Sequence, residues 1–159
     1  MSITFRQFNQ DEYINYRKWS IKEYSDDLIK SGAVAKDKAY QIASGEFASL
    51  LPQGMETANN YFFIIVNEQN EDIGMIWYVM DKPEEVFISD LMITEKNRKR
   101  GYGKQALFLL EQMVMSLGIK KISFHVLDSN TAAIALYRSV GYDMDRKTGP
   151  DSGYMSKRI

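Results

Sequence analysis

The sequence predicts one domain of the mixed α/β class over residues 1–159. Apolar runs of strand length alternate with segments in which apolar residues recur at helical spacing, and glycine-rich or polar turns separate them. The predicted order is β-α-α-β-β-β-α-β-α-β-β. Hydrophobic residues make up 45% of the chain and aromatic residues 13%, which is typical of a globular protein with a sizeable core.

The first part of the chain predicts a short strand around Phe5 and two helices. Asn9 is a preferred N-cap residue, so the first helix is expected within residues 11–31, ending at Gly32. Arg17 interrupts its apolar stripe. The second helix is expected over residues 36–51, before Pro52. The core stripe of the first helix is predicted to contain Ile14, Ile21, Tyr24 and Leu28.

The rest of the chain predicts six strands and two helices. Strands are expected at 61–66 and 73–80, joined as a hairpin by a polar turn at 67–72, and at 86–93 after a connection at 81–85. A helix over 104–117, ended by Gly118, precedes a strand at 119–126 and a short helix at 131–140. Two final strands, 142–147 and 154–158, flank a turn at 149–153. The core stripe of the 104–117 helix is predicted to contain Leu109, Leu110, Met113 and Leu117.

Composition excludes several kinds of site. The chain has no cysteine and a single histidine, His125, which excludes disulfides, thiolate metal sites, a cysteine nucleophile and a histidine-rich metal site. The formal net charge of −1 gives no basic field for nucleic acid. No window reaches the roughly 18 apolar residues of a membrane span, and no signal peptide is evident. We expect a cytoplasmic protein without a metal.

The most informative segment is the turn Arg98–Gly103, between a predicted strand and a predicted helix. Its two glycines allow the backbone to approach a ligand closely, because they lack a Cβ. The following helix N-terminus offers unpaired N–H groups and a partial positive charge, which suit a phosphate or pyrophosphate. Arg98, Lys99, Arg100 and Lys104 add positive charge at the same place.

Several interpretations of this turn compete. A P-loop requires four residues between its glycines and a Ser or Thr after the lysine, but only one residue separates these glycines and Gln105 follows Lys104. A Rossmann fingerprint would place the turn in a first βαβ unit with an acid about 20 residues further on. An ordinary glycine turn with a solvated basic run is a further alternative. The segment closely resembles the R-x-x-G-x-G/A turn of the GNAT superfamily of acyl-CoA-dependent N-acyltransferases.

A second segment strengthens this resemblance. Asn130 begins the run Asn-Thr-Ala-Ala-Ile-Ala-Leu-Tyr, and Gly141-Tyr142 follows at the family's spacing. Motifs support the resemblance over about residues 60–158, whereas the first 55 residues are supported by pattern alone. The resemblance implies a central mixed, mostly antiparallel sheet flanked by helices, with acetyl-CoA as co-substrate.

The resemblance also implies a set of cofactor contacts. Main-chain groups of the strand end Leu91-Met92-Ile93, freed by a bulge, would pair with the pantetheine arm. The backbone of the turn would hold the pyrophosphate, and residues of the second signature would contact the pantetheine. The implied cofactor-binding residues are Leu91, Met92, Ile93, Arg98, Lys99, Arg100, Gly101, Tyr102, Gly103, Lys104, Asn130, Ala133 and Tyr137. For Asn130, an N-cap role is the alternative.

Tyr137 and Asp90 are the candidate catalytic residues. The resemblance assigns Tyr137 the role of the acid that protonates the departing thiolate, although its spacing also suits a core aromatic. Asp90 lies inside an apolar strand, where burial raises a carboxyl pKa toward that of a useful base. Alternatively, Asp90 is a structural carboxylate, and the base is Glu85 or a chain of water molecules. His125 is expected to be a satisfied core histidine.

The expected activity is transfer of an acetyl group from acetyl-CoA to a primary amine by direct attack in a ternary complex. The acceptor is an amine of a small molecule or of a protein, and a homodimer is a reasonable expectation from the resemblance. The alternatives are a non-catalytic acyl-CoA-binding sensor or interaction domain, and a transferase for longer acyl groups. Four aromatic residues are expected either to line the acceptor pocket or to pack in the core, namely Trp19, Tyr24, Trp77 and Tyr78.

Overall fold

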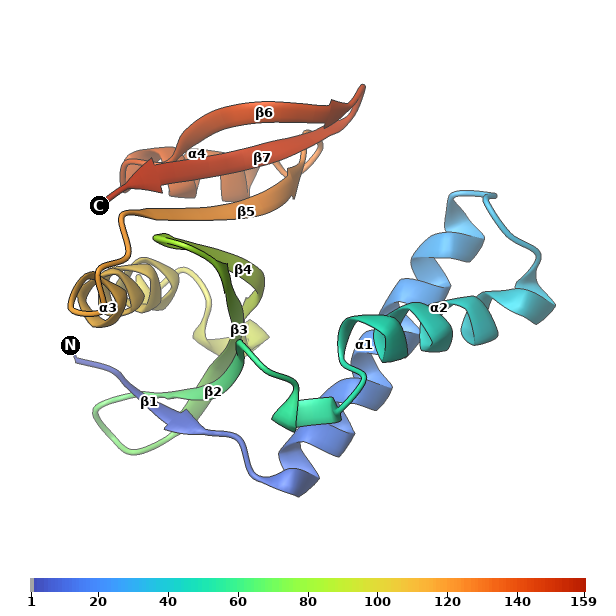
Figure 1. Ribbon diagram of the computed structural model, residues 1–159, viewed down its shortest axis with the longest axis horizontal. Helices are drawn as coiled ribbons and strands as arrows, with labels where there is room; N and C mark the ends of the chain where they lie inside the picture. The colour runs from blue at the N-terminus through green and yellow to red at the C-terminus, as the bar shows by residue number, and fades with distance from the viewer. Residues whose placement is uncertain (1) are drawn as a thin grey trace. The chain divides into compact units, whose positions relative to one another are not determined.

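The computed structural model describes residues 2–159, which form two compact units (Figure 1). Residues 8–58 form a helical unit, and residues 2–7 with 59–159 form a sheet unit. No helix among residues 2–159 combines the length and the apolar character needed to cross a membrane.

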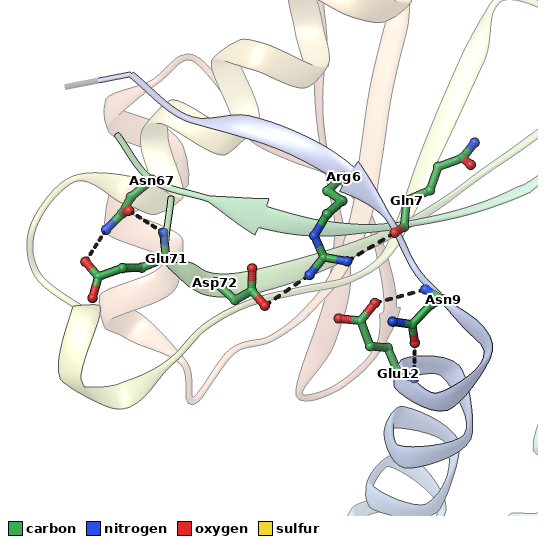
Figure 2. Close-up of polar contacts among 7 residues, drawn as sticks. All are labelled: Arg6, Gln7, Asn9, Glu12, Asn67, Glu71 and Asp72. Atoms are coloured by element: carbon green, nitrogen blue, oxygen red, sulfur yellow. Dashed lines mark hydrogen bonds and ion pairs between the residues drawn. The ribbon is translucent and has the colours of Figure 1, made fainter. Parts of the chain in front are cut away.

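The helical unit contains α1 (Gln10–Lys30), α2 (Lys36–Leu50) and the short 3-10 helix η1 (Gly54–Glu56). A capping box begins α1: Glu12 N–H donates to Asn9 Oδ1 over 2.8 Å, and Asn9 N–H donates to Glu12 Oε1 over 2.9 Å (Figure 2). Gly32 follows the helix with a φ of +73°, in the left-handed region that glycine tolerates. The predicted start and end of this helix are therefore confirmed.

The predicted apolar stripe of α1 is partly wrong. Ile21 is buried, but Ile14 and Tyr24 are exposed, whereas Tyr13 and Tyr16 are buried. Contacts within the helical unit account for the difference between the predicted and observed stripes. The Tyr16 ring is buried because it packs edge-on against Phe8. Tyr24 stays exposed, and its hydroxyl hydrogen-bonds to Glu46 of α2. Arg17, which interrupts the stripe, places its guanidinium 6.0 Å from the centre of the Phe47 ring.

The sheet unit holds a seven-stranded sheet in the order β1-β2-β3-β4-β5-β7-β6 (Figure 1). Only β4 and β5 pair in parallel among the described strands; every other neighbouring pair is antiparallel. The predicted mixed, mostly antiparallel sheet is confirmed. Its strands are β1 (Thr4–Gln7), β2 (Asn60–Val66), β3 (Asp72–Lys82), β4 (Glu85–Ile93), β5 (Lys121–Leu127), β6 (Asp143–Gly149) and β7 (Ser152–Arg158).

Polar side chains fix the edge of the sheet near β1. Arg6 forms an ion pair with Asp72 at the start of β3, with 3.0 Å between Nη2 and Oδ2 (Figure 2). Asn67 organises the β2–β3 turn, because its Oδ1 accepts hydrogen bonds from the backbone N–H groups of Gln69 and Glu71. Figure 2 shows the bond from Glu71. Such side-chain turns let Asn begin a tight connection.

Two helices, α3 (Tyr102–Met115) and α4 (Thr131–Ser139), pack against one apolar cluster on the sheet. Leu107, Leu110 and Val114 of α3 are buried in this cluster. The predicted stripe of α3 is therefore correct at Leu110 and wrong at Leu117, which is 66% exposed. Leu117 lies beyond the helix, which starts two residues earlier than expected and ends at Met115, and the buried stripe runs through Leu107, Leu110 and Val114 instead.

A buried carboxylate joins α3 to the C-terminal strands. Glu111 accepts hydrogen bonds from the Tyr142 hydroxyl over 3.0 Å and from Lys157 Nζ over 2.9 Å. Burial, with a smaller effect of Glu111, raises the pKa of Tyr142 far above its usual range. The Tyr142 N–H also donates to the carbonyl oxygen of Tyr137, so this cluster holds the end of α4.

Loss of the cation from this cluster should destabilise the fold. In Lys157→Met, the buried Glu111 carboxylate loses its cation and keeps only the Tyr142 hydroxyl as a donor, so we expect the free energy of unfolding to fall by about 2 kcal/mol. Lys121→Met is the matched control, because Lys121 is 29% exposed against 28% for Lys157, but its partner Asp145 is 40% exposed against 9% for Glu111. An exposed pair contributes less than about 1 kcal/mol. Urea unfolding measures both variants, and equal losses would contradict the prediction.

Candidate active site

The strands β4 and β5 separate into a fork at the centre of the sheet. Their parallel pairing ends at Ile88 and Phe124, while β4 continues to Ile93 and β5 to Leu127. Figure 1 shows the green and orange strands diverging. A β-bulge lies at the same point: Tyr78 of β3 pairs with Ile88 and Trp77 pairs with Asp90, so Ser89 is an extra residue in β4. A bulge bends its strand, which accounts for the divergence.

The fork leaves one edge of β4 without a neighbouring strand. Residues 90–93 pair with β3 on one side, but β5 provides no partner beyond Ile88 on the other side. Unpaired strand groups can bind an extended ligand in the manner of an added strand. The side chains of Leu91, Met92 and Ile93 are half-buried. The Ile93 carbonyl already accepts a hydrogen bond from Arg98 Nε over 2.8 Å.

The glycine turn follows β4 and begins α3. A short 3-10 helix, η2 (Glu95–Asn97), precedes it, and the buried Asn97 donates to Thr94 Oγ1 over 2.7 Å. Gly101 is the N-cap of α3 with a φ of +86° and has no side chain to accept from the first turn. The first helical bond runs from Gln105 N–H to Gly101 O, so the N–H groups of residues 102–104 precede the helical ladder.

The charges around this turn favour an anion. Arg98, Lys99, Arg100 and Lys104 are all exposed, or nearly so, and none forms an ion pair within residues 2–159. A Cβ at Gly103 would lie 3.7 Å from Leu136 Cδ2, so the first turn of α3 lies beside α4. Uncapped N–H groups, a helix dipole and nearby cations together suit a phosphate or pyrophosphate.

A cavity of about 140 Å³ fills the fork. Leu107, Phe124 and Tyr137 line it from the face of the sheet on which α3 and α4 pack. His125 follows Phe124, so it points to the opposite face, because successive strand residues alternate. The cavity thus reaches both faces of the sheet. Its full lining is Ile88, Ser89, Asp90, Leu91, Leu107, Phe124, His125 and Tyr137.

The two candidate catalytic residues meet in this cavity. Tyr137 packs edge-on against Phe124, with ring centres 4.4 Å apart, and Asp90 lies on the opposing strand. Burial, and to a smaller extent the charge of Asp90, raises the pKa of Tyr137 above its ordinary value. The phenol therefore keeps its proton at neutral pH and can donate it to a group that becomes negative.

The second sequence signature lies beside the cavity. Asn130 is the N-cap residue of α4, but its exposed side chain makes no capping hydrogen bond; only its carbonyl oxygen accepts, from Ile134 N–H over 3.0 Å. Its amide is available to a ligand. Ala133 is half-buried, and α4 has no fully buried residue.

Two other residues are candidate acids or bases, Glu85 and His125. Glu85 lies outside the cavity, and His125 is more exposed than expected. Glu85 accepts a hydrogen bond from the Ser123 hydroxyl at the start of β4 and does not line the cavity. His125 is not a core residue: it is exposed at the cavity, and its Nε2 lies 3.3 Å from Thr148 Oγ1. The end of the β4–β5 pairing just before His125 explains this exposure, and the apolar run around it gave no sign of that end.

None of the four aromatic candidates for the acceptor pocket lines the fork cavity. Tyr78 is a core residue that stacks on Tyr61, and burial raises its pKa to about 12. Trp77 is buried, and its Nε1 donates to Asn60 over 2.8 Å. Trp19 and Tyr24 belong to the helical unit, where both are partly exposed. The cavity residues that sequence reasoning missed are Ile88, Ser89, Leu107 and Phe124, whose positions at the cavity depend on the bulge and the fork.

Comparison with known proteins relates the chain to acetyltransferases. Residues 15–142 match the acetyltransferase (GNAT) family. YycN of Bacillus subtilis (strain 168), named an uncharacterized N-acetyltransferase, is 32% identical over 146 residues, which cover 89% of this chain and 93% of YycN. YdgE of the same organism, also named an uncharacterized N-acetyltransferase, is 28% identical over 147 residues, which cover 91% of this chain and 94% of YdgE.

Solved structures have the same fold. The crystal structure of YycN superposes with a TM-score of 0.83 at 29% identity, over 94% of this chain and 98% of YycN. The PaiA N-acetyltransferase of Thermoplasma acidophilum, solved in complex with coenzyme A, gives a TM-score of 0.69 at 15% identity over all of both chains. The family match over most of the chain and the identity to YycN together show that this protein belongs to the acetyltransferase (GNAT) family and is an acyl-CoA-dependent N-acyltransferase.

Proposed function

We propose that the protein transfers an acetyl group from acetyl-CoA to a primary amine by direct attack in a ternary complex. The observation that carries this proposal is the fork cavity, where Tyr137 and Asp90 meet beside an uncapped helix N-terminus. The names of the relatives YycN and YdgE, both called N-acetyltransferases, favour an acetyl group over a longer acyl chain. The absence of cysteine favours direct transfer, because no thiol can carry the acyl group.

Three parts of the sheet unit would bind acetyl-CoA. The free edge of β4 would pair with the amides of the pantetheine arm, and the Asn130 side chain would add a contact to it. The N–H groups at the start of α3 would hold the pyrophosphate, with exposed cations around it. PaiA, which has the same fold, was solved in complex with coenzyme A, and this supports coenzyme A as the ligand of the fold.

The chemistry then needs one base and one acid. The amine nitrogen attacks the thioester carbonyl carbon, the carbon–sulfur bond breaks, and the thiolate takes a proton. We assign that proton to the Tyr137 hydroxyl, whose raised pKa keeps it protonated until the sulfur becomes negative. Asp90, directly or through water, takes the proton that the amine loses. Each proton thus has a named donor or acceptor.

Free thiol release from acetyl-CoA with a panel of primary amines tests the proposal. We expect release to depend on at least one amine. Acetyl-CoA binding without release for any amine would instead support the alternative of a non-catalytic acyl-CoA-binding domain.

The backbone site can be tested at Gly103. A Cβ there has room beside Leu136, so Gly103→Val should fold, but its branched side chain should block close approach of the pyrophosphate. We expect calorimetry to show acetyl-CoA affinity at least about tenfold weaker. Met115→Val, at the exposed last turn of the same helix, controls for placing a β-branched residue in α3. Unchanged affinity in a folded Gly103→Val protein would exclude this site.

The acid can be tested at Tyr137. Tyr137→Phe keeps the ring packed on Phe124 and removes only the hydroxyl. With an amine from the panel, kcat should fall by about 10²- to 10⁴-fold, while the Kd for acetyl-CoA stays nearly constant. Tyr61→Phe is the control, because this tyrosine does not line the cavity. Equal kcat values, with chemistry shown to be rate-limiting, would make Tyr137 a packing residue.

The coupling between the two catalytic groups can be tested by titration. Burial is the larger cause of the raised Tyr137 pKa and the Asp90 charge the smaller, so Asp90→Asn should lower this pKa without returning it to its ordinary value. The phenol should therefore lose its proton at lower pH in the variant. Carbon-13 NMR of the tyrosine Cζ atoms follows this titration, and Tyr137→Phe assigns the signal. An unchanged pKa would show that the Asp90 charge does not reach Tyr137.

A further inference from the structure

We propose that the acceptor amine carries an anionic group, such as a carboxylate, and that Arg146 binds it. This inference rests on the proposed acetyl transfer and names the class of its acceptor. The observation behind it is a row of side chains, His125, Tyr154 and Arg146, that begins at the wall of the fork cavity and ends in a cation.

The sheet register places the three side chains side by side. Tyr154 of β7 pairs with His125 of β5 on one side and with Arg146 of β6 on the other. The His125 and Tyr154 rings meet edge to face with centres 5.5 Å apart, and the Arg146 guanidinium lies 4.9 Å from the centre of the Tyr154 ring. Phe87 of β4 packs against the same tyrosine at 5.9 Å. The cation thus lies one aromatic ring away from the cavity wall.

Arg146 has no carboxylate partner in the described part of the chain, although acids surround it. The neighbouring Asp145 forms an ion pair with Lys121 over 2.8 Å, and Asp128 forms one with Lys147. The hydrogen bond from Lys121 is the main cause of the lowered Asp145 pKa, and Arg146 contributes least. Among residues 2–159, no acid lies within ion-pair distance of the Arg146 guanidinium, so its donors are available.

The charges on the two sides of the row match a molecule with an amine and an anion. Asp90 in the cavity attracts a positively charged amine, while Arg146 attracts an anion beyond the Tyr154 ring. Stacking on tyrosine holds a guanidinium in a defined plane, and a planar guanidinium binds a carboxylate through two parallel hydrogen bonds. The Tyr154 ring, with Phe87 beside it, would contact the part of the acceptor between its two charged ends.

Two probes of the same shape test this inference: 4-(aminomethyl)benzoate and its neutral analogue 4-(aminomethyl)benzamide. With acetyl-CoA, we expect kcat/KM of the wild-type protein to favour the benzoate by about three- to fivefold. Arg146→Gln should abolish that preference, and high salt should weaken it in the wild type, because exposed charges are screened. Arg158→Gln makes the same charge change at the far end of β7, opposite Lys121, and should keep the preference.

Calorimetry with the same two probes and CoA-bound protein separates this inference from the proposed function. An Arg146-dependent preference in Kd would support the inference even without turnover, and only the further absence of thiol release for every amine of the panel would overturn the proposed transfer. Turnover with no preference, or with a preference that Arg146→Gln retains, would overturn the inference and leave the transfer intact. Failure of both probes to bind would also overturn the inference.

Discussion

The arrangement of the site depends on the early end of the hydrogen-bonded ladder between β4 and β5. A parallel pair that continued to the ends of both strands would close the sheet and leave no cavity. The extra residue Ser89 bends β4 away after four pairs, and the divergence yields both the free edge and the space that holds Tyr137 and Asp90. One irregularity in strand pairing thus creates both the free edge of β4 and the cavity beside it.

The fold also supports the proposed acid through a continuous set of contacts. Glu111 of α3 fixes the Tyr142 hydroxyl, and Tyr142 packs against Phe124 with ring centres 5.1 Å apart. Phe124 in turn packs against Tyr137, whose carbonyl accepts a hydrogen bond from the Tyr142 N–H. The Gly-Tyr pair of the second signature therefore has a structural explanation: its tyrosine holds the end of α4 in place. A group that must meet a developing charge benefits from such fixed support.

The sequence predicted the order of the elements and most of their bounds, because many of them begin or end at a strong local signal such as Asn9 or Gly32. It also predicted the turn and the pair of Tyr137 and Asp90, although their roles stay predictions. The family resemblance implied a bulge that frees the end of β4, and a bulge is present at Ser89. The sequence did not predict the divergence of β4 from β5, the exposure of His125 or the buried face of α3. These features depend on strand register and helix phase, which are set by contacts between distant segments. The single domain and the homodimer also stay predictions.

In the sequence, the helical unit lies between β1 and β2, two strands that are neighbours in the sheet. β1 ends at Gln7 and β2 starts at Asn60, and these strands pair with Gln7 opposite Phe63. Both ends of residues 8–58 are thus anchored at one corner of the sheet unit. The entropic cost of closing such a loop rises only slowly with its length. A change in the length of this segment would therefore alter the cost of pairing β1 with β2 only slightly, and the register of the strands at the fork does not depend on that length.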